Sequence, residues 1–310
     1  MRIQAPRRAT TLLVALTLHM AASSASAPAP QARPAPSTDA PTLDQVKHAT
    51  ITGVFDRPVT LKDGVYEGPP SVEGGASRPR LTLIDTLAAS GNLDDTPALE
   101  TVVLLSETSG ASGERIYVAV VAGRGDGVRT VGTALIGDRT RIRSLTVVER
   151  AIVMDVVEAG PEDAMCCPSQ LARKSFALES GTLELISSET TGPLSIEVLA
   201  GANWRLVRLD DEPVPKDVEA PTLAIEGASV AGFGGCNRYS GTVAEEAPGR
   251  IAVGRLLTTR MACPPPVMDL ETRFLDTLGK ADQYSFLMGR LVLTAVEGER
   301  ITQLEFAGRP

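Results

Sequence analysis

Short apolar runs separated by turn-forming residues make up the chain between residues 80 and 160. The runs are four to seven residues long and rich in Val, Ile, Leu and Thr, a composition typical of β-strands. Glycine-rich segments such as 109–113 and 123–127 lie between them and leave little room for crossover helices. This close spacing predicts antiparallel pairing. The predicted strands cover residues 81–84, 101–105, 116–121, 130–135, 144–148 and 151–157.

The last third of the chain adds an amphipathic helix to the same pattern. After three prolines at 264–266, apolar residues recur at three- and four-residue spacing from Val267 to Leu278, and Gly279 follows. This spacing predicts a helix that the prolines begin and the glycine ends. The fold class is therefore α+β: two β-rich domains of mainly antiparallel strands, the second with a single packed helix. The strands predicted around the helix cover residues 204–209, 222–226, 229–232, 250–253, 284–288, 291–296 and 301–306.

The amino terminus has the pattern of an export signal. A basic start with three arginines precedes a short apolar stretch at 12–22, and small residues follow. This stretch is shorter than the roughly 20 residues of a membrane helix. We expect cleavage after Ala25, because cleavage after Ala27 would leave a proline first. The residues after Arg7-Arg8 fit a twin-arginine signal poorly, so the ordinary secretory route is favoured. No cysteine lies near this position, so a lipid anchor of the bacterial lipoprotein kind is not expected.

Composition divides the rest of the chain. Residues 26–43 are rich in Pro and Ala and predict a semi-extended linker. A first β-rich domain is expected over 44–190 and a second over 199–310, with a polar break near 188–200. Loss of the signal and its three arginines would change the net charge from −8 to −11. Such an acidic chain disfavours nucleic acid and anionic lipid as partners, and no other apolar run predicts a membrane span.

Four cysteines follow the export signal: Cys166, Cys167, Cys236 and Cys263. In an oxidising compartment an even count predicts disulfides. A bridge between Cys236 and Cys263 is favoured over a metal or redox site, because zinc would need other ligands and the mature chain has only one histidine. For the adjacent Cys166 and Cys167, three arrangements remain open: a vicinal bridge, separate bridges to Cys236 and Cys263, or two free thiols. The vicinal bridge is somewhat favoured, and its strain leaves a redox role open.

Residues 203–306 resemble the META domain, the family that includes the heat-shock protein HslJ. The resemblance rests on Trp204-Arg-Leu, on Gly-Gly-Cys236-Asn237-Arg238-Tyr-Ser-Gly241, on Met261-Ala-Cys263, on a helix with Glu271, Phe274 and Leu278, and on a final Leu-Val-Leu strand. It implies a small α+β domain of exported or envelope proteins that is associated with stress tolerance. The family offers no catalytic residue to transfer.

The first domain resembles a module of exported bacterial proteins with no known activity. The residues that carry this resemblance are the segment 73–79, Glu-Gly-Gly-Ala-Ser-Arg-Pro, and Cys166-Cys167-Pro168.

The remaining motifs support little catalytic chemistry. The single mature histidine, His48, lies next to the linker, and no pair of carboxylates stands out. The segment 91–96 alternates oxygen-bearing side chains as a calcium loop does, but Pro97 stands where that loop requires glycine. Asn237 and Arg238 follow two glycines, and we expect their side chains to bond backbone groups of that loop. The same two residues form the candidate interaction loop.

These observations predict a periplasmic or secreted, non-catalytic protein, a stress-related binding or protective module without a cofactor or metal. Its partner would be an envelope or secreted protein. Two alternatives remain open: a carrier of a small apolar ligand in a cavity between sheet and helix, and a hydrolase inhibitor or enzyme of unrecognised type.

Overall fold

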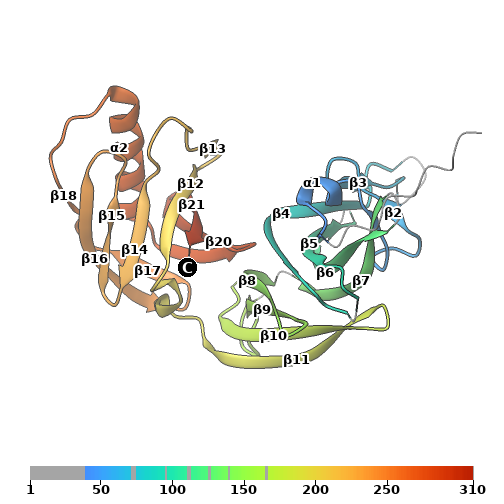
Figure 1. Cartoon of the computed structure of the whole chain (residues 1–310). Helices are drawn as coiled ribbons and strands as arrows, with labels where there is room; N and C mark the ends of the chain where they lie inside the picture. The colour runs from blue at the N-terminus through green and yellow to red at the C-terminus, as the bar shows by residue number, and fades with distance from the viewer. Residues whose placement is uncertain are drawn as a thin grey trace, which may run out of the picture. The chain divides into compact units, whose positions relative to one another are not determined.

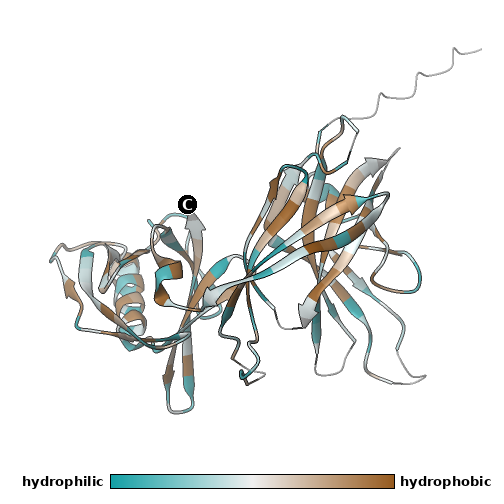
Figure 2. Ribbon diagram, turned by 90° about the horizontal axis from the view of Figure 1, so that it is seen from below, coloured by the Kyte–Doolittle hydropathy of each residue, from teal (hydrophilic) through white to brown (hydrophobic). Residues whose placement is uncertain are grey.

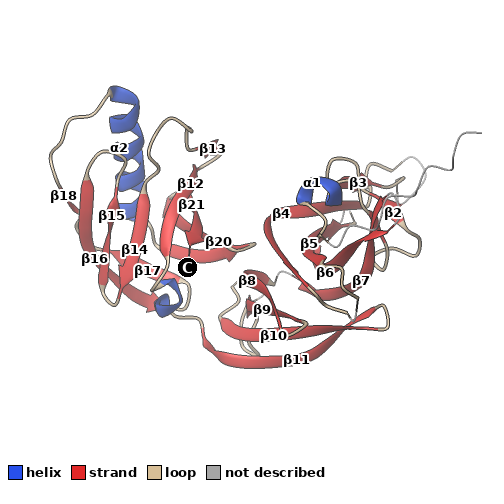
Figure 3. Ribbon diagram, viewed as in Figure 1, coloured by secondary structure: helices blue, strands red, loops and turns tan. Residues whose placement is uncertain are grey.

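The computed structural model describes residues 39–70, 75–94, 96–109, 113–124, 127–138, 140–164 and 167–309. Over these ranges the structure is mostly antiparallel β, as predicted from the spacing of the apolar runs (Figure 3). The main exception to antiparallel pairing is the contact of β1 with β7, which is parallel at Thr50 and Arg129.

The first module contains a seven-stranded sheet (Figure 1). A one-turn helix, α1 (Leu43–Val46), precedes it, and Thr42 caps this helix through a capping box. In order of pairing the strands are β2 (Val59–Thr60), β1 (Thr50–Ile51), β7 (Gly127–Asp138), β6 (Glu114–Arg124), β5 (Glu100–Thr108), β4 (Arg80–Gly91) and β3 (Val65–Glu67).

A four-stranded sheet completes this module. Its central strand β10 pairs along its length with β9 and β11. Neither β10 nor β11 is predicted from the sequence: most of β11 is exposed, and in β10 a charged residue, Lys174, takes one of the buried positions. Strand β11 continues to Pro193 and so extends into the polar break expected near 188–200. In order of pairing the strands are β11 (Thr182–Pro193), β10 (Gln170–Glu179), β9 (Ala151–Glu158) and β8 (Arg141–Val148).

Strand β5 shows why its sequence lacks alternation of apolar and polar residues. All four residues from Val102 to Leu105 are fully buried. Val102 and Leu104 belong to the core that β5 shares with the four-stranded sheet, whereas Val103 and Leu105 belong to the core on the opposite face. A strand with both faces covered needs apolar residues at every position.

The C-terminal part forms one further sheet that closes on itself, because β12 pairs with both β14 and β21. A 3-10 turn (Ile196–Leu199) precedes it. Figure 2 shows brown, apolar positions alternating with paler ones along these strands. In order of pairing the strands are β13 (Glu212–Pro213), β12 (Asn203–Leu209), β14 (Thr222–Glu226), β15 (Ser229–Phe233), β16 (Arg238–Ala247), β17 (Arg250–Val253), β19 (Gln283–Leu287), β20 (Arg290–Glu297) and β21 (Arg300–Arg309), and β18 (Leu257–Thr258) adds to β16.

The predicted amphipathic helix is present as α2 (Pro265–Lys280) and ends one residue beyond Gly279. Phe274 and Leu278 are fully buried on its apolar face. The Phe274 ring makes edge contacts with Tyr239 and Phe306, with centroids 5.7 and 6.3 Å away. Aromatic edge contacts of this kind add to the hydrophobic stabilisation of the helix against the sheet. Burial also raises the pKa of Tyr239.

Candidate functional site

A buried carboxylate organises the loop that carries the Gly-Gly-Cys-Asn motif. Glu271, on α2, is 5% exposed. Its Oε2 accepts hydrogen bonds from the backbone N–H of Cys236 at 2.9 Å and of Asn237 at 2.5 Å, and its Oε1 accepts one from Asn237 Nδ2 at 2.7 Å. Hydrogen bonds from N–H donors to a carboxylate are charge-assisted and therefore strong. They hold the loop to the helix.

Gly234 makes this close approach possible. A Cβ atom at this position would lie 2.8 Å from Glu271 Oε2. The neighbouring Gly235 has φ of +121°, which side chains rarely allow. Gly234 is therefore required by the closeness of the Glu271 side chain, and Gly235 by its backbone conformation.

Asn237 connects the loop to the residues before α2. Its Oδ1 accepts hydrogen bonds from the backbone N–H of Met261 at 2.6 Å and from Thr259 Oγ1 at 2.9 Å. Asn237 is buried, so its side chain is not accessible to a partner, which corrects its place in the candidate interaction loop. The backbone groups that its side chain bonds belong to Met261 and not, as expected, to the glycine loop.

The disulfide expected between Cys236 and Cys263 is present, with an S–S distance of 2.04 Å. It joins the same two segments that Asn237 connects. Cys236 is buried and Cys263 is half-buried. Together, the disulfide and the Glu271 and Asn237 hydrogen bonds form one connected unit, which we call the Glu271 network (Cys236, Asn237, Met261, Cys263, Glu271).

An exposed face lies on the segment that this network fixes. Leu257 and Met261 are 61% and 62% exposed. Leu257 pairs with Ser240 of β16. Alternation along β16 places Ser240 and Arg238 on the same outward side, opposite the buried Tyr239.

We call this outward face the strap (Arg238 with residues 255–261). Arg238, Arg255 and Arg260 are exposed and add positive charge beside the two apolar side chains. The candidate interaction residue Arg238 thus lies on the surface. The exposed Leu257 and Met261 beside it are not among the predicted site residues, although Met261 belongs to the Met-Ala-Cys motif.

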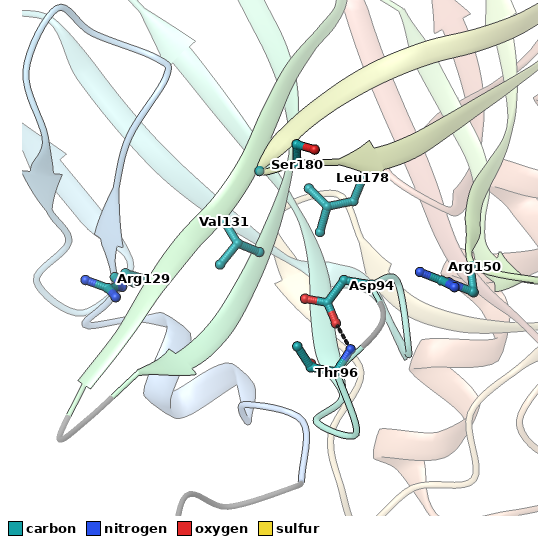
Figure 4. A pocket seen from close by; sticks show the side chains of 8 residues that line it. Asp94, Thr96, Arg129, Val131, Arg150, Leu178 and Ser180 are labelled. Carbon is teal, nitrogen blue, oxygen red and sulfur yellow. Dashed lines mark hydrogen bonds between the residues drawn. The ribbon is translucent and has the colours of Figure 1, made fainter.

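The first module contains a separate cleft of about 570 Å³. Figure 4 shows its lining side chains, with Asp94, Arg150 and Leu178 directed toward a common space. Asp94 and Thr96 belong to the segment 91–96 that resembles a calcium loop. The sequence does not single out the other lining residues, because they come from strands and turns far apart in the chain. The lining consists of Asp94, Thr96, Arg129, Val131, Arg150, Leu178, Ser180 and Gly181.

The alternating oxygen-bearing side chains of segment 91–96, which resemble a calcium loop, have a structural explanation. Asp94 Oδ1 accepts a hydrogen bond from the backbone N–H of Thr96 at 2.7 Å. Glu100 is buried and accepts the N–H of Leu93 at 2.9 Å. These carboxylates brace the loop between β4 and β5, as a polar turn does.

The other predicted cysteine pair is described only at Cys167, since Cys166 lies outside the described residues. Cys167 is disulfide-bonded. Separate bridges to Cys236 and Cys263 are excluded, because those two cysteines are bonded to each other. Asp163 closes this loop by accepting hydrogen bonds from Gly160 N, Ser169 N and Ser169 Oγ, and these bonds lower its pKa.

Two features are absent from the residues that the structure describes. No group of three or more His, Cys, Asp or Glu side chains there is arranged to hold a metal ion. None of the helices in the same ranges is long and apolar enough to cross a membrane.

Comparisons with known proteins give a family match in the C-terminal third and two similar solved structures. A search of curated proteins finds no match. An NMR structure of a protein from Burkholderia xenovorans is 26% identical, covers 36% of this chain and 85% of its own, and has a TM-score of 0.31. A second NMR structure is 22% identical over 37% of this chain and 94% of its own, with the same TM-score. Residues 197–307 match the family model of the META domain, which confirms the resemblance found in the sequence.

Proposed function

We propose that this chain is a secreted, non-catalytic binding protein of the bacterial envelope, with a stress-related protective role, and that its META region contacts a partner protein through the strap. We further propose that the two modules are separate domains, the second an α+β unit. An extracytoplasmic location is supported by the META match and by the disulfide, since disulfides persist in oxidising compartments.

One observation carries the proposal: the Glu271 network uses the family's conspicuous polar residues for structure and leaves apolar side chains exposed. Glu271 and Asn237 are buried and hydrogen-bonded to the loop, while Met261 is 62% exposed on the segment they fix. Exposed apolar side chains on a preorganised segment lose little entropy on binding. The arginines around them favour a partner with an acidic surface.

Capture from a periplasmic extract tests this proposal, with and without heat stress. Met261→Ser should weaken capture of a specific partner at least tenfold, about 1.4 kcal/mol. Ile301→Ser is the matched control, because Ile301 is equally exposed, at 62%, on another strand of the same sheet. Equal capture by both variants, or no specific partner under either condition, would refute the proposed role of the strap. A captured hydrolase would identify the protein as an inhibitor.

A second candidate function, transport of a small apolar ligand, is favoured by a depression of about 340 Å³ beside α2. Leu256 and Leu275 are in its wall, together with Gly279 and Lys280. Titration with an environment-sensitive apolar dye tests this candidate. Leu275→Asp should abolish the fluorescence increase if the ligand binds here, and an unchanged increase would exclude this depression as its site.

A further inference from the structure

The cleft of the first module is lined by side chains of both charges above an apolar floor. Arg129 and Arg150 carry guanidinium groups, and Asp94 carries a carboxylate. Val131 and Leu178 supply the apolar surface. In Figure 4, Arg129 and Arg150 lie on opposite sides of Asp94. A volume of about 570 Å³ is in the range of small-molecule sites, which combine apolar walls with a few polar groups.

The floor of the cleft is fixed by a close approach of two hairpins. A Cβ atom at Gly132 of β7 would lie 2.6 Å from Leu178 Cδ1 and 3.1 Å from Leu183 Cβ. Val131, beside this glycine, and Leu178 are both half-buried. The glycine thus lets β7 and the β10–β11 hairpin meet at the floor.

Arg150 occupies an unusual position in its turn. Glu149 and Arg150 form the two-residue connection between Val148 and Ala151, with φ of 48° and 69°. Two successive residues with positive φ define a type I′ turn, in which the second residue is usually glycine because it has no Cβ.

Other turns of this chain follow that rule. Asp63-Gly64, Ser180-Gly181 and Met288-Gly289 each have positive φ at both residues and glycine at the second. Among the described residues, Glu149-Arg150 is the one such pair without a glycine. An unfavourable backbone conformation that is kept for a particular side chain indicates a function for that side chain. The Arg150 side chain points into the cleft (Figure 4).

The lining chemistry selects a class of ligand. None of the described lining residues is aromatic, which disfavours sugars and nucleobases, since these bind by stacking on rings. Guanidinium groups bind carboxylates through paired N–H donors, and a carboxylate binds an ammonium group. Arginine has five N–H donors and a carboxylate about four acceptor positions, so each can bind a ligand in addition to a neighbouring residue.

We propose that this cleft binds a short peptide with free termini and apolar side chains. Arg150 holds its carboxylate, Asp94 holds its ammonium group, and Val131 and Leu178 contact its side chains. This site lies in a different module from the strap, so the proposal can be tested independently of the function proposed above.

Isothermal titration calorimetry of the mature chain tests the proposal with three probes: L-leucyl-L-leucine, its C-terminal amide and its N-acetyl form. We expect the free dipeptide to bind with a dissociation constant of about 1 mM or tighter. Each blocked form should bind at least tenfold more weakly, because one charged group loses its partner. Equal binding of the three probes, or no binding of the free dipeptide up to about 10 mM, would overturn the proposal.

The variant Arg150→Gly separates binding from folding. It places glycine where a type I′ turn favours it, so the melting temperature should stay equal or rise while dipeptide affinity falls at least tenfold. Arg150→Lys should retain part of the affinity, since it keeps the charge but not the paired donors. Arg80→Gln, at an exposed arginine of β4 outside the cleft, is the matched control and should bind as the wild type does. Unchanged affinity of Arg150→Gly would contradict the assigned role of Arg150.

Discussion

Glu271 in the C-terminal region and Asp94 in the first module are both carboxylates that accept hydrogen bonds from loop backbone groups, but they differ in solvent exposure. Glu271 is buried and accepts three hydrogen bonds from two neighbouring residues. Asp94 is half-buried, accepts the N–H of Thr96 and lines a cleft. A buried charge with several donors stabilises one loop conformation, whereas a carboxylate that lines a cleft can still bind a ligand. The Gly-Gly-Cys-Asn motif and its partner Glu271 therefore stabilise the fold, whereas residues outside this motif line the cleft.

The largest effect should come from removing the buried carboxylate. Glu271→Ala leaves the N–H groups of Cys236 and Asn237 and the Asn237 amide without their acceptor, at about 1 to 3 kcal/mol for each orphaned group. We expect the free energy of unfolding to fall by about 3 to 6 kcal/mol in urea denaturation, because the losses are not additive. Asp269→Ala, at an exposed position of the same helix, should change it by less than about 0.5 kcal/mol. Similar losses of unfolding free energy in both variants would show that the effect comes from the helix and not from the Glu271 network.

Removal of the disulfide should have the next largest effect. The bond closes a loop over a sequence separation of 27 residues. Cys236→Ser combined with Cys263→Ser should lower the free energy of unfolding by about 3 to 4 kcal/mol, because the unfolded chain gains entropy. Denaturant titration of the double variant, beside the wild type with and without reductant, measures this loss. If the double variant is also less stable than the reduced wild type, the loss of free energy comes from the serine side chains and not from the missing bond.

A smaller effect is expected at the floor of the cleft. Gly132→Ala places a methyl group against Leu178 and Leu183 and should destabilise by about 1 to 3 kcal/mol through overpacking. Gly123→Ala is the matched control, since a Cβ atom there meets nothing within 4 Å. Thermal unfolding of the two variants makes the comparison, and equal melting temperatures would show that β7 and the β10–β11 hairpin are less closely packed than described.

The smallest effect concerns acid stability in the first module. Burial alone would raise the pKa of Asp155, but hydrogen bonds from Arg173 at 2.8 Å and Ser144 at 3.0 Å lower it overall. A lowered pKa in the folded state stabilises the protein above the unfolded value of about 3.9, and this contribution is lost as the pH falls through the folded value. Asp155→Asn should remove this contribution, which we expect to be below about 1 kcal/mol because Arg173 is half exposed. The free energy of unfolding of both proteins is measured between pH 3 and 6. The same pH dependence in the variant and the wild type would contradict this prediction.

Much of the fold is predictable because local patterns and tertiary burial agree. The run Val102–Leu105 and the helix from Val267 to Leu278 are both buried where their apolar spacing predicts. Strand β11 is missed because it is an edge strand whose residues are mostly exposed, and β10 is missed because the charged Lys174 interrupts its buried apolar positions. Its exposed Leu185 and Ile186 lie at a register shift in the pairing.

The site is less predictable than the fold. Compartment and cysteine count favour a bridge between Cys236 and Cys263 but leave other pairings open, and the structure gives the pairing. The contact of Asn237 with Glu271 is not predictable, because Glu271 is 34 residues away and the META resemblance names it without indicating a partner. The cleft residues are farther apart still, from Asp94 to Gly181, and only the pairing of hairpins brings them together.

Hydrogen exchange at the Met261 amide tests the central claim most directly, since this N–H donates to Asn237 Oδ1 at 2.6 Å while its side chain is exposed. If the Glu271 network holds the strap in place, this amide exchanges slowly in the wild type and much faster in Glu271→Gln. Fast exchange in the wild type, at the rate of an unstructured peptide, would contradict the account.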